Sequence, residues 1–311
     1  MKLLITGADG FVGRWLVRAA CGDGHDVVAA VLPGTTLPDQ WRDDHAGIEV
    51  IEADIRIEAD LARLAAARPD AVVHLAAVAS GAAARKDPEG AMQVNGIATV
   101  WLLEALGSTN HATRFLYVSS GEVYGKEHDA AIVESVAVYP VSPYAASKMA
   151  AEVAAFGMCE GTKIELIIAR PFPHTGPGQT TTYVLPALAA RLVEARVTGS
   201  PTVRTGNLDA VRDFLDVRDV VRAYLLLLER GVPGEVYNVA SGVGRRLSDC
   251  FDALAGIVGV SATAQQDAAL LRPGDIPVLI GNPAKLRAAT GWVPTISFEQ
   301  TLQDLVDAQA H

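Results

Sequence analysis

The chain has few cysteines and no long apolar run, and both absences narrow its class. Its three cysteines, Cys21, Cys159 and Cys250, match neither a disulfide framework nor a metal-binding motif. No stretch approaches the roughly 18 consecutive apolar residues that a membrane span requires. The N-terminal segment also lacks the apolar core of a signal peptide, because Gly7 interrupts it. We therefore expect a cytoplasmic protein with no metal ion and no membrane contact.

Positive charge is also in short supply. The 311 residues include 26 Lys and Arg against 36 Asp and Glu, which gives a formal net charge of -10. A general nucleic-acid binder needs a basic face to neutralise phosphates, so nucleic acid is excluded as a partner. An anionic small molecule is not excluded, because a few arginines in a pocket outweigh a distant surface charge.

The first half of the chain alternates short apolar runs with segments of helical spacing. Runs that are apolar on both faces and alternate with helices indicate a parallel sheet covered on both sides. The fold class that we predict is α/β, a doubly wound parallel sheet of the Rossmann type. The expected strands are 2–6, 26–31, 48–53, 71–75, 114–118 and 164–169, with helices such as 12–21 and 60–67 between them.

The pattern loosens after Arg170. The segment RPFPHTGPGQ, residues 170–179, is rich in Pro and Gly and is predicted to be a loop. Helices are expected over 183–195 and 217–229 and from Phe298 onward, with a further strand over 235–240. We predict a dinucleotide-binding domain formed by 1–171 and 207–241. A smaller, interleaved α/β substrate domain would comprise 172–206 and 242–311.

Three glycines, Gly7, Gly10 and Gly13, stand where the first strand gives way to the first helix. The first permits a tight turn, the second lets a diphosphate approach the backbone, and the third lets helix and strand pack closely. The N-terminus of the following helix offers free N–H donors. At this position the pattern predicts dinucleotide binding.

The choice between NAD and NADP stays open. An NAD site usually carries an acid after the second strand, but AAVLPG, residues 29–34, contains neither an acid nor an arginine. Asp54 ends the third strand, and two interpretations are equally plausible from the sequence. It is either a hydrogen-bond partner of the adenine or an acid at a helix N-terminus.

Polar residues follow the fifth strand, in FLYVSSGEVYG, residues 115–125, where a buried strand runs into hydroxyls and a carboxylate. Further on, Tyr144 and Lys148 in SPYAASK share one face of an expected helix. A neighbouring ammonium favours the phenolate, which would make the tyrosine an acid–base group at neutral pH. Behind a dinucleotide motif, this pair indicates catalysis.

TGADGFVG, HLAA, SSGEVYG and YAASK, in this order, resemble the extended short-chain dehydrogenase/reductase family, which includes NAD-dependent epimerases and dehydratases. RPFPHTGPGQ, RDFLDVRDVV and RPGDIP extend the resemblance over essentially the whole chain. SSGEVYG, GPGQ and GNLDAVRDFLDVRDV resemble most the branch that handles GDP-6-deoxyhexoses. This branch includes GDP-mannose 4,6-dehydratases and GDP-4-keto-6-deoxymannose reductases.

The resemblance implies roles for particular residues. Ser120 would hydrogen-bond the sugar at the reacting carbon and Tyr144 would transfer the proton. Lys148 would hold the nicotinamide ribose and lower the pKa of Tyr144. The implied cofactor-binding residues are Gly7, Gly10, Phe11, Val12, Gly13, Asp54, Ile55, Leu75, Ala76, Ala77, Asn95, Tyr144, Lys148 and Pro171. The implied substrate-binding residues are Ser120, Gly121, Glu122, His174, Gln179, Arg212 and Arg272.

Glu122 separates two chemistries. In related dehydratases a threonine stands at position 120 and a glutamate at 122 removes the C5 proton; here Ser120 and Gly121 precede Glu122, as in the reductases. Glu122 keeps dehydration open as an alternative; in the other interpretation it is an exposed carboxylate or one that binds a substrate hydroxyl.

Arg212 and Arg272 are candidate diphosphate clamps. For either arginine the alternative is a surface ion pair, for example that of Arg212 with Asp213 or Asp216.

The sequence therefore predicts an NADPH- or NADH-dependent reductase of a 4-keto-6-deoxy nucleotide sugar. A GDP-mannose 4,6-dehydratase and a 4-epimerase are the first alternatives, and a non-catalytic dinucleotide sensor is the second. Relatives commonly dimerise through two helices of each subunit, so we also predict a homodimer that uses helices 94–106 and 144–158.

Overall fold

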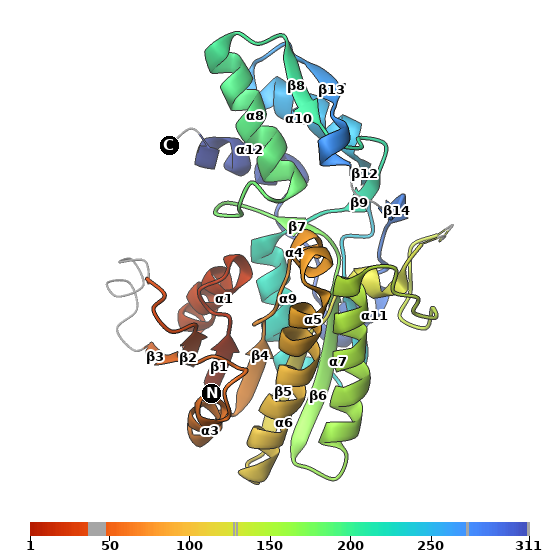
Figure 1. Ribbon diagram of the computed structural model, residues 1–311. Helices are drawn as coiled ribbons and strands as arrows, with labels where there is room; N and C mark the ends of the chain where they lie inside the picture. Colours follow the sequence, from red (N-terminus) through yellow and green to blue (C-terminus); the bar gives the residue numbers. More distant parts are fainter. Residues whose placement is uncertain (37–47, 127, 129, 272–273, 310–311) are drawn as a thin grey trace.

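The computed structural model describes residues 1–36, 48–126, 128, 130–271 and 274–309. Its largest element is a seven-stranded sheet in the order β11-β6-β5-β4-β1-β2-β3, with every neighbouring pair parallel (Figure 1). This order is typical of doubly wound folds, and the predicted fold class is confirmed. The strands are β1 (Lys2–Thr6), β2 (Asp26–Val31), β3 (Glu49–Glu52), β4 (Ala71–His74), β5 (Thr113–Val118), β6 (Ile164–Pro171) and β11 (Val236–Val239).

Helices cover both faces of this sheet because side chains alternate along each buried strand. In β1, Leu3 and Ile5 pack into the core shared with α1 (Phe11–Gly22) and α9 (Val217–Arg230). Leu4, between them, points to the opposite core. That second core is shared with α3 (Glu58–Ala66), α6 (Ala98–Ser108) and α7 (Pro143–Cys159). Short helical segments join these layers, namely α4 (Gly81–Lys86), α5 (Pro88–Met92), η1 (Gln93–Ile97), η2 (Gly121–Tyr124) and α11 (Ala284–Thr290).

A third core lies beyond one end of the sheet and joins α8 (Val184–Thr198), α10 (Leu247–Val258) and α12 (Phe298–Gln309) (Figure 1). Two small sheets lie beside it. One pairs β8 (Thr202–Thr205) with β13 (Thr263–Gln266), which η3 (Ala268–Leu270) follows, and the other has the order β12 (Gly244–Arg246), β9 (Val211–Asp213) and β14 (Val278–Leu279). The predicted domain boundaries stay a prediction. Within the described ranges, no helix is long and apolar enough to cross a membrane.

Segment 170–179 differs from the prediction of a loop throughout. The backbone pairing of β6 with β11 continues through Pro171, so Arg170 and Pro171 belong to the sheet. A further short strand, β7 (His174–Thr175), pairs with β10 (Leu215–Asp216). Pairing with distant strands overrides the local Pro and Gly content. It also brings His174 to the carboxyl end of the large sheet.

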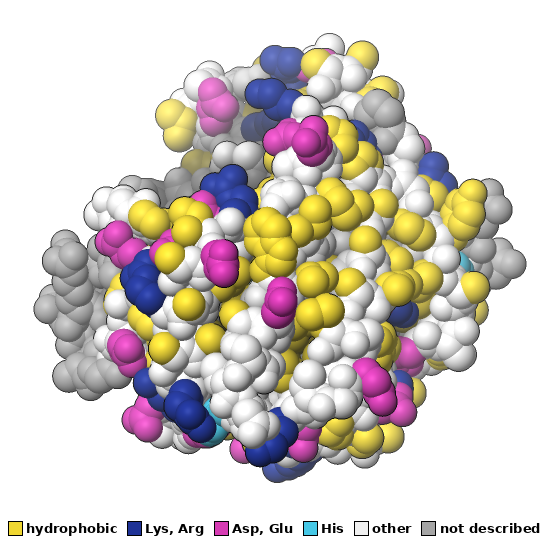
Figure 2. All heavy atoms as spheres, turned by 60° about the horizontal axis from the view of Figure 1, so that its bottom comes forward, with side chains coloured by type: hydrophobic (Ala, Val, Ile, Leu, Met, Phe, Trp, Pro, Cys, Tyr) yellow, Lys and Arg dark blue, Asp and Glu magenta, His cyan; other side chains and the backbone are white. Residues whose placement is uncertain are grey.

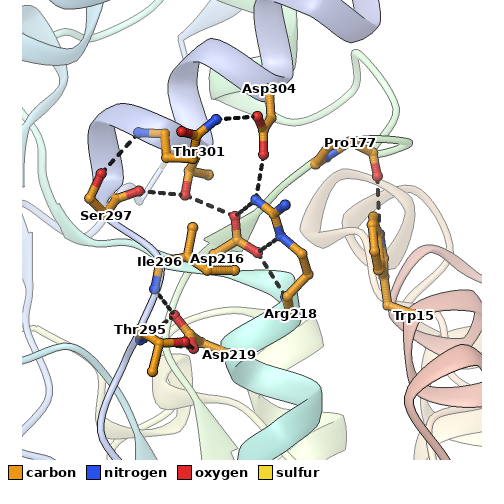
Figure 3. Close-up of polar contacts among 11 residues, drawn as sticks. Trp15, Pro177, Asp216, Arg218, Asp219, Thr295, Ile296, Ser297, Thr301 and Asp304 are labelled. Atoms are coloured by element: carbon orange, nitrogen blue, oxygen red, sulfur yellow. Dashed lines mark hydrogen bonds and ion pairs between the residues drawn. The ribbon is translucent and has the colours of Figure 1, made fainter. Parts of the chain in front are cut away.

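A polar joint holds the third core against the sheet (Figure 3). Asp216 caps α9 by accepting from the Arg218 backbone N–H at 2.8 Å. The Arg218 guanidinium binds the Asp216 carboxylate and reaches Asp304 of α12 at 2.5 Å. Close by, Trp15 Nε1 of α1 donates to the Pro177 carbonyl at 3.1 Å. These contacts fix α12 and the 176–179 turn relative to the helices that flank the sheet.

Candidate functional site

A cavity of about 700 Å³ lies at the carboxyl ends of the sheet strands. One wall comes from the ends of β1 to β6, and the other from segments 171–185, 212–214 and 274–279. Ligands of doubly wound folds bind at this edge of the sheet. The cavity is therefore the candidate active site.

The glycine turn forms the floor of one end of this cavity. Gly7 has a φ of +65°, and a Cβ there would lie 2.9 Å from the Ala76 backbone nitrogen. A Cβ on Gly13 would come within 2.3 Å of the Gly7 carbonyl oxygen, so only glycine lets α1 pack this closely. Gly10 precedes α1 and supplies no side-chain cap, which leaves the first N–H groups to a ligand. This cradle fits the diphosphate of a dinucleotide.

Asp54 lines the cavity beside Arg56, at the ends of β2 and β3. The Asp54 carboxylate accepts hydrogen bonds from Arg56 Nε at 2.9 Å and Nη2 at 2.5 Å, and this pairing lowers the pKa of Asp54. Because α3 begins at Glu58, Asp54 is not its N-terminal acid, and that alternative is wrong. The sequence analysis did not identify Arg56, because a residue that selects the cofactor is expected after the second strand and Arg56 follows the third.

Ser120, Glu122 and Tyr144 meet at the end of β5. The Ser120 hydroxyl accepts from the Glu122 backbone N–H at 3.2 Å and also hydrogen-bonds Tyr144. Burial in the cavity wall raises the pKa of Tyr144, the negative charge of Glu122 adds to this, and the Ser120 hydrogen bond opposes it. We expected a lowered pKa from the neighbouring lysine, and this expectation is wrong. The phenol is held in its protonated form.

Lys148 lies on the same face of α7 as Tyr144, as predicted, but its ammonium group points to β5. Nζ donates to the Val118 carbonyl at 2.8 Å and lies 5.1 Å from the centre of the Tyr117 ring. Burial lowers the pKa of Lys148 to about 8, against the opposing charge of Glu152. The lysine therefore titrates close to neutral pH.

His174 and Gln179 occupy the loop that faces the glycine turn. The His174 ring stacks on Phe11 with 6.4 Å between centroids, and its Nδ1 donates to the Phe172 carbonyl at 3.0 Å. Burial lowers the pKa of His174, so the ring is neutral. The Gln179 amide bonds the His174 carbonyl and the Thr175 hydroxyl. It therefore shapes the loop in addition to lining the cavity.

Arg212 reaches the cavity from β9, and its Nη2 donates to Asp275 Oδ1 at 2.7 Å. Arg212 therefore does form an ion pair, as the alternative interpretation expects, but neither Asp213 nor Asp216 is the partner. The Asp213 carboxylate accepts instead from the Ser241 hydroxyl and from three backbone N–H groups, and Asp216 pairs with Arg218. Arg272 lies outside the described residues.

Most of the predicted site residues are brought together. Those that line the cavity are Gly7, Gly10, Phe11, Val12, Gly13, Asp54, Ile55, Leu75, Ala76, Ala77, Ser120, Glu122, Tyr144, Lys148, Pro171, His174, Gln179 and Arg212. Gly121 does not, because it packs against the Phe172 ring, 3.1 Å from a would-be Cβ. Asn95 is buried behind the wall, where its amide oxygen binds the Val78 N–H at 2.7 Å. The sequence predicts a ligand contact for both, and both are better described as supports.

The sequence also missed several wall residues. Tyr183, Phe214, Asp275 and Ile276 line the cavity on the side opposite the strand ends, and Tyr224 lines it from α9. Asp275 and Ile276 belong to the RPGDIP motif, so the motif that supplied Arg272 could have identified them. Phe214 lies in RDFLDVRDVV, the motif that contains Arg212, and could have been identified in the same way, whereas Tyr183 and Tyr224 carried no such signal. No cluster of possible metal ligands occurs in the part of the chain that the structure describes.

A dinucleotide cradle beside a Ser120, Tyr144 and Lys148 set defines a nicotinamide-dependent enzyme of the short-chain dehydrogenase/reductase type. Residues 4–305 match the family described as GDP-mannose 4,6 dehydratase, and the chain belongs to this family. The predicted resemblance is confirmed.

Known relatives are similar to this chain over nearly their full lengths. GDP-6-deoxy-D-mannose reductase from Pseudomonas aeruginosa is 38% identical over 98% of this chain and 96% of the relative. The structure of RMD from Pseudomonas aeruginosa complexed with NADPH is 35% identical and covers 99% of this chain and 98% of that chain, with a TM-score of 0.84. UDP-glucose 4-epimerase from Thermus thermophilus, in complex with NAD, is 28% identical and covers 100% and 99%, with a TM-score of 0.88.

Proposed function

We propose that the protein reduces the C4 ketone of a 4-keto-6-deoxy nucleotide sugar with NADPH or NADH. The substrate is GDP-4-keto-6-deoxymannose, and the product is GDP-rhamnose or its C4 epimer. The observation that carries the proposal is the placement of Tyr144 beside Ser120 in the cavity wall, where burial raises the pKa of the phenol. Reduction of a ketone needs a proton donor at the developing alkoxide, and a phenol with a raised pKa retains its proton for that step.

Each residue of the set has a role in this reaction. The reduced nicotinamide supplies the hydride. The Ser120 and Tyr144 hydroxyls donate hydrogen bonds to the ketone oxygen, and Tyr144 passes its proton to that oxygen as negative charge develops. The buried Lys148 ammonium then offsets the charge left on the phenolate and holds the nicotinamide ribose. Arg212, with its planar guanidinium, binds the substrate diphosphate.

A 4,6-dehydratase remains the alternative that one observation favours. Glu122 lines the cavity, and its charge acts on Tyr144, so a carboxylate base stands beside the acid. Gly121 supports the reductase, because it has no side-chain acid and packs on Phe172. A 4-epimerase uses the same Tyr144 and Lys148 but regenerates its cofactor in each turnover, so it shows no net oxidation of NADPH or NADH.

The test is cofactor oxidation by purified protein with GDP-4-keto-6-deoxymannose, first with NADPH and then with NADH. We expect rapid oxidation with a 6-deoxyhexose product, and the faster cofactor decides the preference. In the Glu122→Gln variant a reductase should lose less than about tenfold in kcat, whereas a dehydratase that relied on this base would lose about 10² or more. Turnover of GDP-mannose without oxidation of either cofactor would overturn the proposal in favour of the dehydratase.

We also propose that the protein is a homodimer that buries a hydrophobic patch on its helical face. The patch consists of Met92, Ile97, Trp101, Val153 and Phe156, contributed by α5, η1, α6 and α7 and each exposed by 36% or more. Hydrophobic side chains gather in this way across the face seen in Figure 2. A contiguous exposed patch of large apolar side chains indicates a protein contact. Its elements include the two helices that the sequence suggested.

Replacing Val153 with Glu should convert the dimer to a monomer, because the interface would then bury an unpaired carboxylate. Sedimentation equilibrium measures the molar mass of each variant. Val197→Glu is the matched control, because Val197 is exposed by 78% on α8, outside the patch. A monomeric wild type, or an unchanged mass for Val153→Glu, would contradict the dimer.

The cytoplasmic location stays a proposal as well. All three cysteines, Cys21, Cys159 and Cys250, carry free thiols. Thiols that remain unpaired suit a reducing compartment, and this supports the proposed location.

A further inference from the structure

A buried ion pair joins α7, the helix of Tyr144 and Lys148, to strand β6. Arg170 of β6 binds Glu152 of α7 through Nε at 3.0 Å and Nη2 at 2.6 Å. The Glu152 side chain is 2% exposed and that of Arg170 is 6% exposed. Burying two charges costs about as much as their attraction returns, so such a pair is weak evidence of a stabilising role. The position of the pair suggests a role in catalysis instead.

Glu152 follows Lys148 by one helical turn, and both side chains belong to the buried stripe of α7. The groups that act on the Lys148 ammonium are the Val118 carbonyl and Tyr117 of β5, His74 of β4 and Glu152 of α7. His74 is neutral because burial lowers its pKa to about 3, and burial keeps the Tyr117 phenol protonated by raising its pKa. Among the described groups, Glu152 is therefore the one negative charge that acts on the ammonium.

Arg170 holds this carboxylate in place. Its two-point hydrogen bonds fix the position of the Glu152 carboxylate, and its guanidinium lies 4.8 Å from the centre of the Tyr124 ring. Tyr124 belongs to η2, the turn that begins just after Ser120 and contains Glu122. The same arginine therefore connects the helix of Tyr144 and Lys148 to the turn of Ser120 and Glu122.

We propose that Glu152 and Arg170 are positioning residues, which keep the buried Lys148 protonated and in place in the cavity wall in the working pH range. The carboxylate offsets the cost of burying an ammonium group, and the arginine fixes the carboxylate. The consequence for catalysis rests on the proposed reductase activity. The consequence for the protonation of Lys148 does not, so the two can be tested separately.

The first test needs no activity. The thermal unfolding midpoint is followed from about pH 6 to about pH 10 for the wild type and for Lys148→Met, and the difference isolates the titration of Lys148. This difference in unfolding midpoint should be constant at low pH and begin to change near pH 8, where the folded-state pKa of Lys148 lies. We call the pH at which it begins to change the turning point. In a Glu152→Gln background the same comparison should turn roughly one pH unit lower, because the offsetting charge is gone.

Glu152→Gln leaves a buried arginine unpaired, so a second variant guards against its failure to fold. The double variant Glu152→Met/Arg170→Met removes both charges and retains volume, which proteins often tolerate. It should show the same downward shift. Asp304→Asn is the matched control, because it breaks an ion pair to Arg218 at the joint and leaves Lys148 untouched. Its turning point should equal that of the wild type.

The second test uses the pH profile of kcat/KM for ketone reduction. In Glu152→Gln the alkaline limb should move to lower pH together with the turning point. Arg170→Met should move the limb in the same direction, and Arg170→Lys, which keeps a charge, should move it less. An unchanged turning point in both the single and the double variant would overturn the proposal. If the wild type has no reductase activity, the proposed function fails, and the unfolding measurements still decide the role of Glu152.

Discussion

Replacing Tyr144 with phenylalanine is expected to lower kcat for ketone reduction by about 10²- to 10⁴-fold. The variant removes the one hydroxyl that can both hydrogen-bond the ketone and deliver a proton, and Ser120 alone can only polarise the oxygen. Because burial and the charge of Glu122 raise the pKa of Tyr144, the phenol stays protonated across the neutral range. In the wild type, the pH profile of kcat should therefore show no ionisation of this phenol near neutral pH.

Steady-state kinetics and a titration of NADPH binding check this prediction together. Binding should change little, because the cradle of Gly7, Gly10 and Gly13 is intact, so the loss should appear in kcat. Tyr237→Phe is the control, since Tyr237 is a buried tyrosine of β11 whose hydroxyl accepts from the Val232 N–H at 3.0 Å. Unchanged behaviour of Tyr144→Phe in every measurement would favour the non-catalytic dinucleotide sensor.

Replacing Lys148 with methionine is expected to abolish activity while stabilising the fold. The pKa of Lys148 falls from 10.5 to about 8 on folding, which corresponds to a cost of about 3 kcal/mol at neutral pH. Methionine fills the same space without a charge. Loss of the hydrogen bond to the Val118 carbonyl takes back about 1 kcal/mol. A net gain of about 1 to 2 kcal/mol in the free energy of unfolding follows.

The sign of the pH dependence distinguishes this explanation from better packing. Below pH 8 the lysine is protonated in both states, so the full cost is present and the stabilisation by methionine is largest. As the pH rises from about 8 to 10.5, the folded protein loses the proton first, and the advantage of the variant should disappear. Chemical denaturation at several pH values measures it. A constant advantage across this range would contradict the assignment.

Much of the architecture is local in origin and was predictable from sequence. Strands such as 2–6 and 26–31 are apolar on both faces, a pattern that a buried parallel strand produces wherever it lies. Gly7 and Gly13 are required by backbone geometry within one turn, and that geometry is what the structure shows. Tyr144 and Lys148 share a helical face because they are four residues apart. Each of these relations spans only a few residues.

Other features depend on contacts between residues far apart in the chain. Arg212 pairs with Asp275 and not with the nearer acids, and His174 is placed by a strand pairing. The direction of the pKa shift of Tyr144 was wrongly predicted because the sequence shows the neighbouring lysine but not the burial.

The sheet, the dinucleotide cradle and the identity of the acid–base pair are therefore predictable from the amino-acid order, since periodicity and short spacings encode them. Which charges face one another, and how much water reaches them, depends on the packing of distant segments. The electrostatic state of Tyr144 and Lys148 depends on burial and on Glu122 and Glu152, whose distance from these groups in space is set by packing.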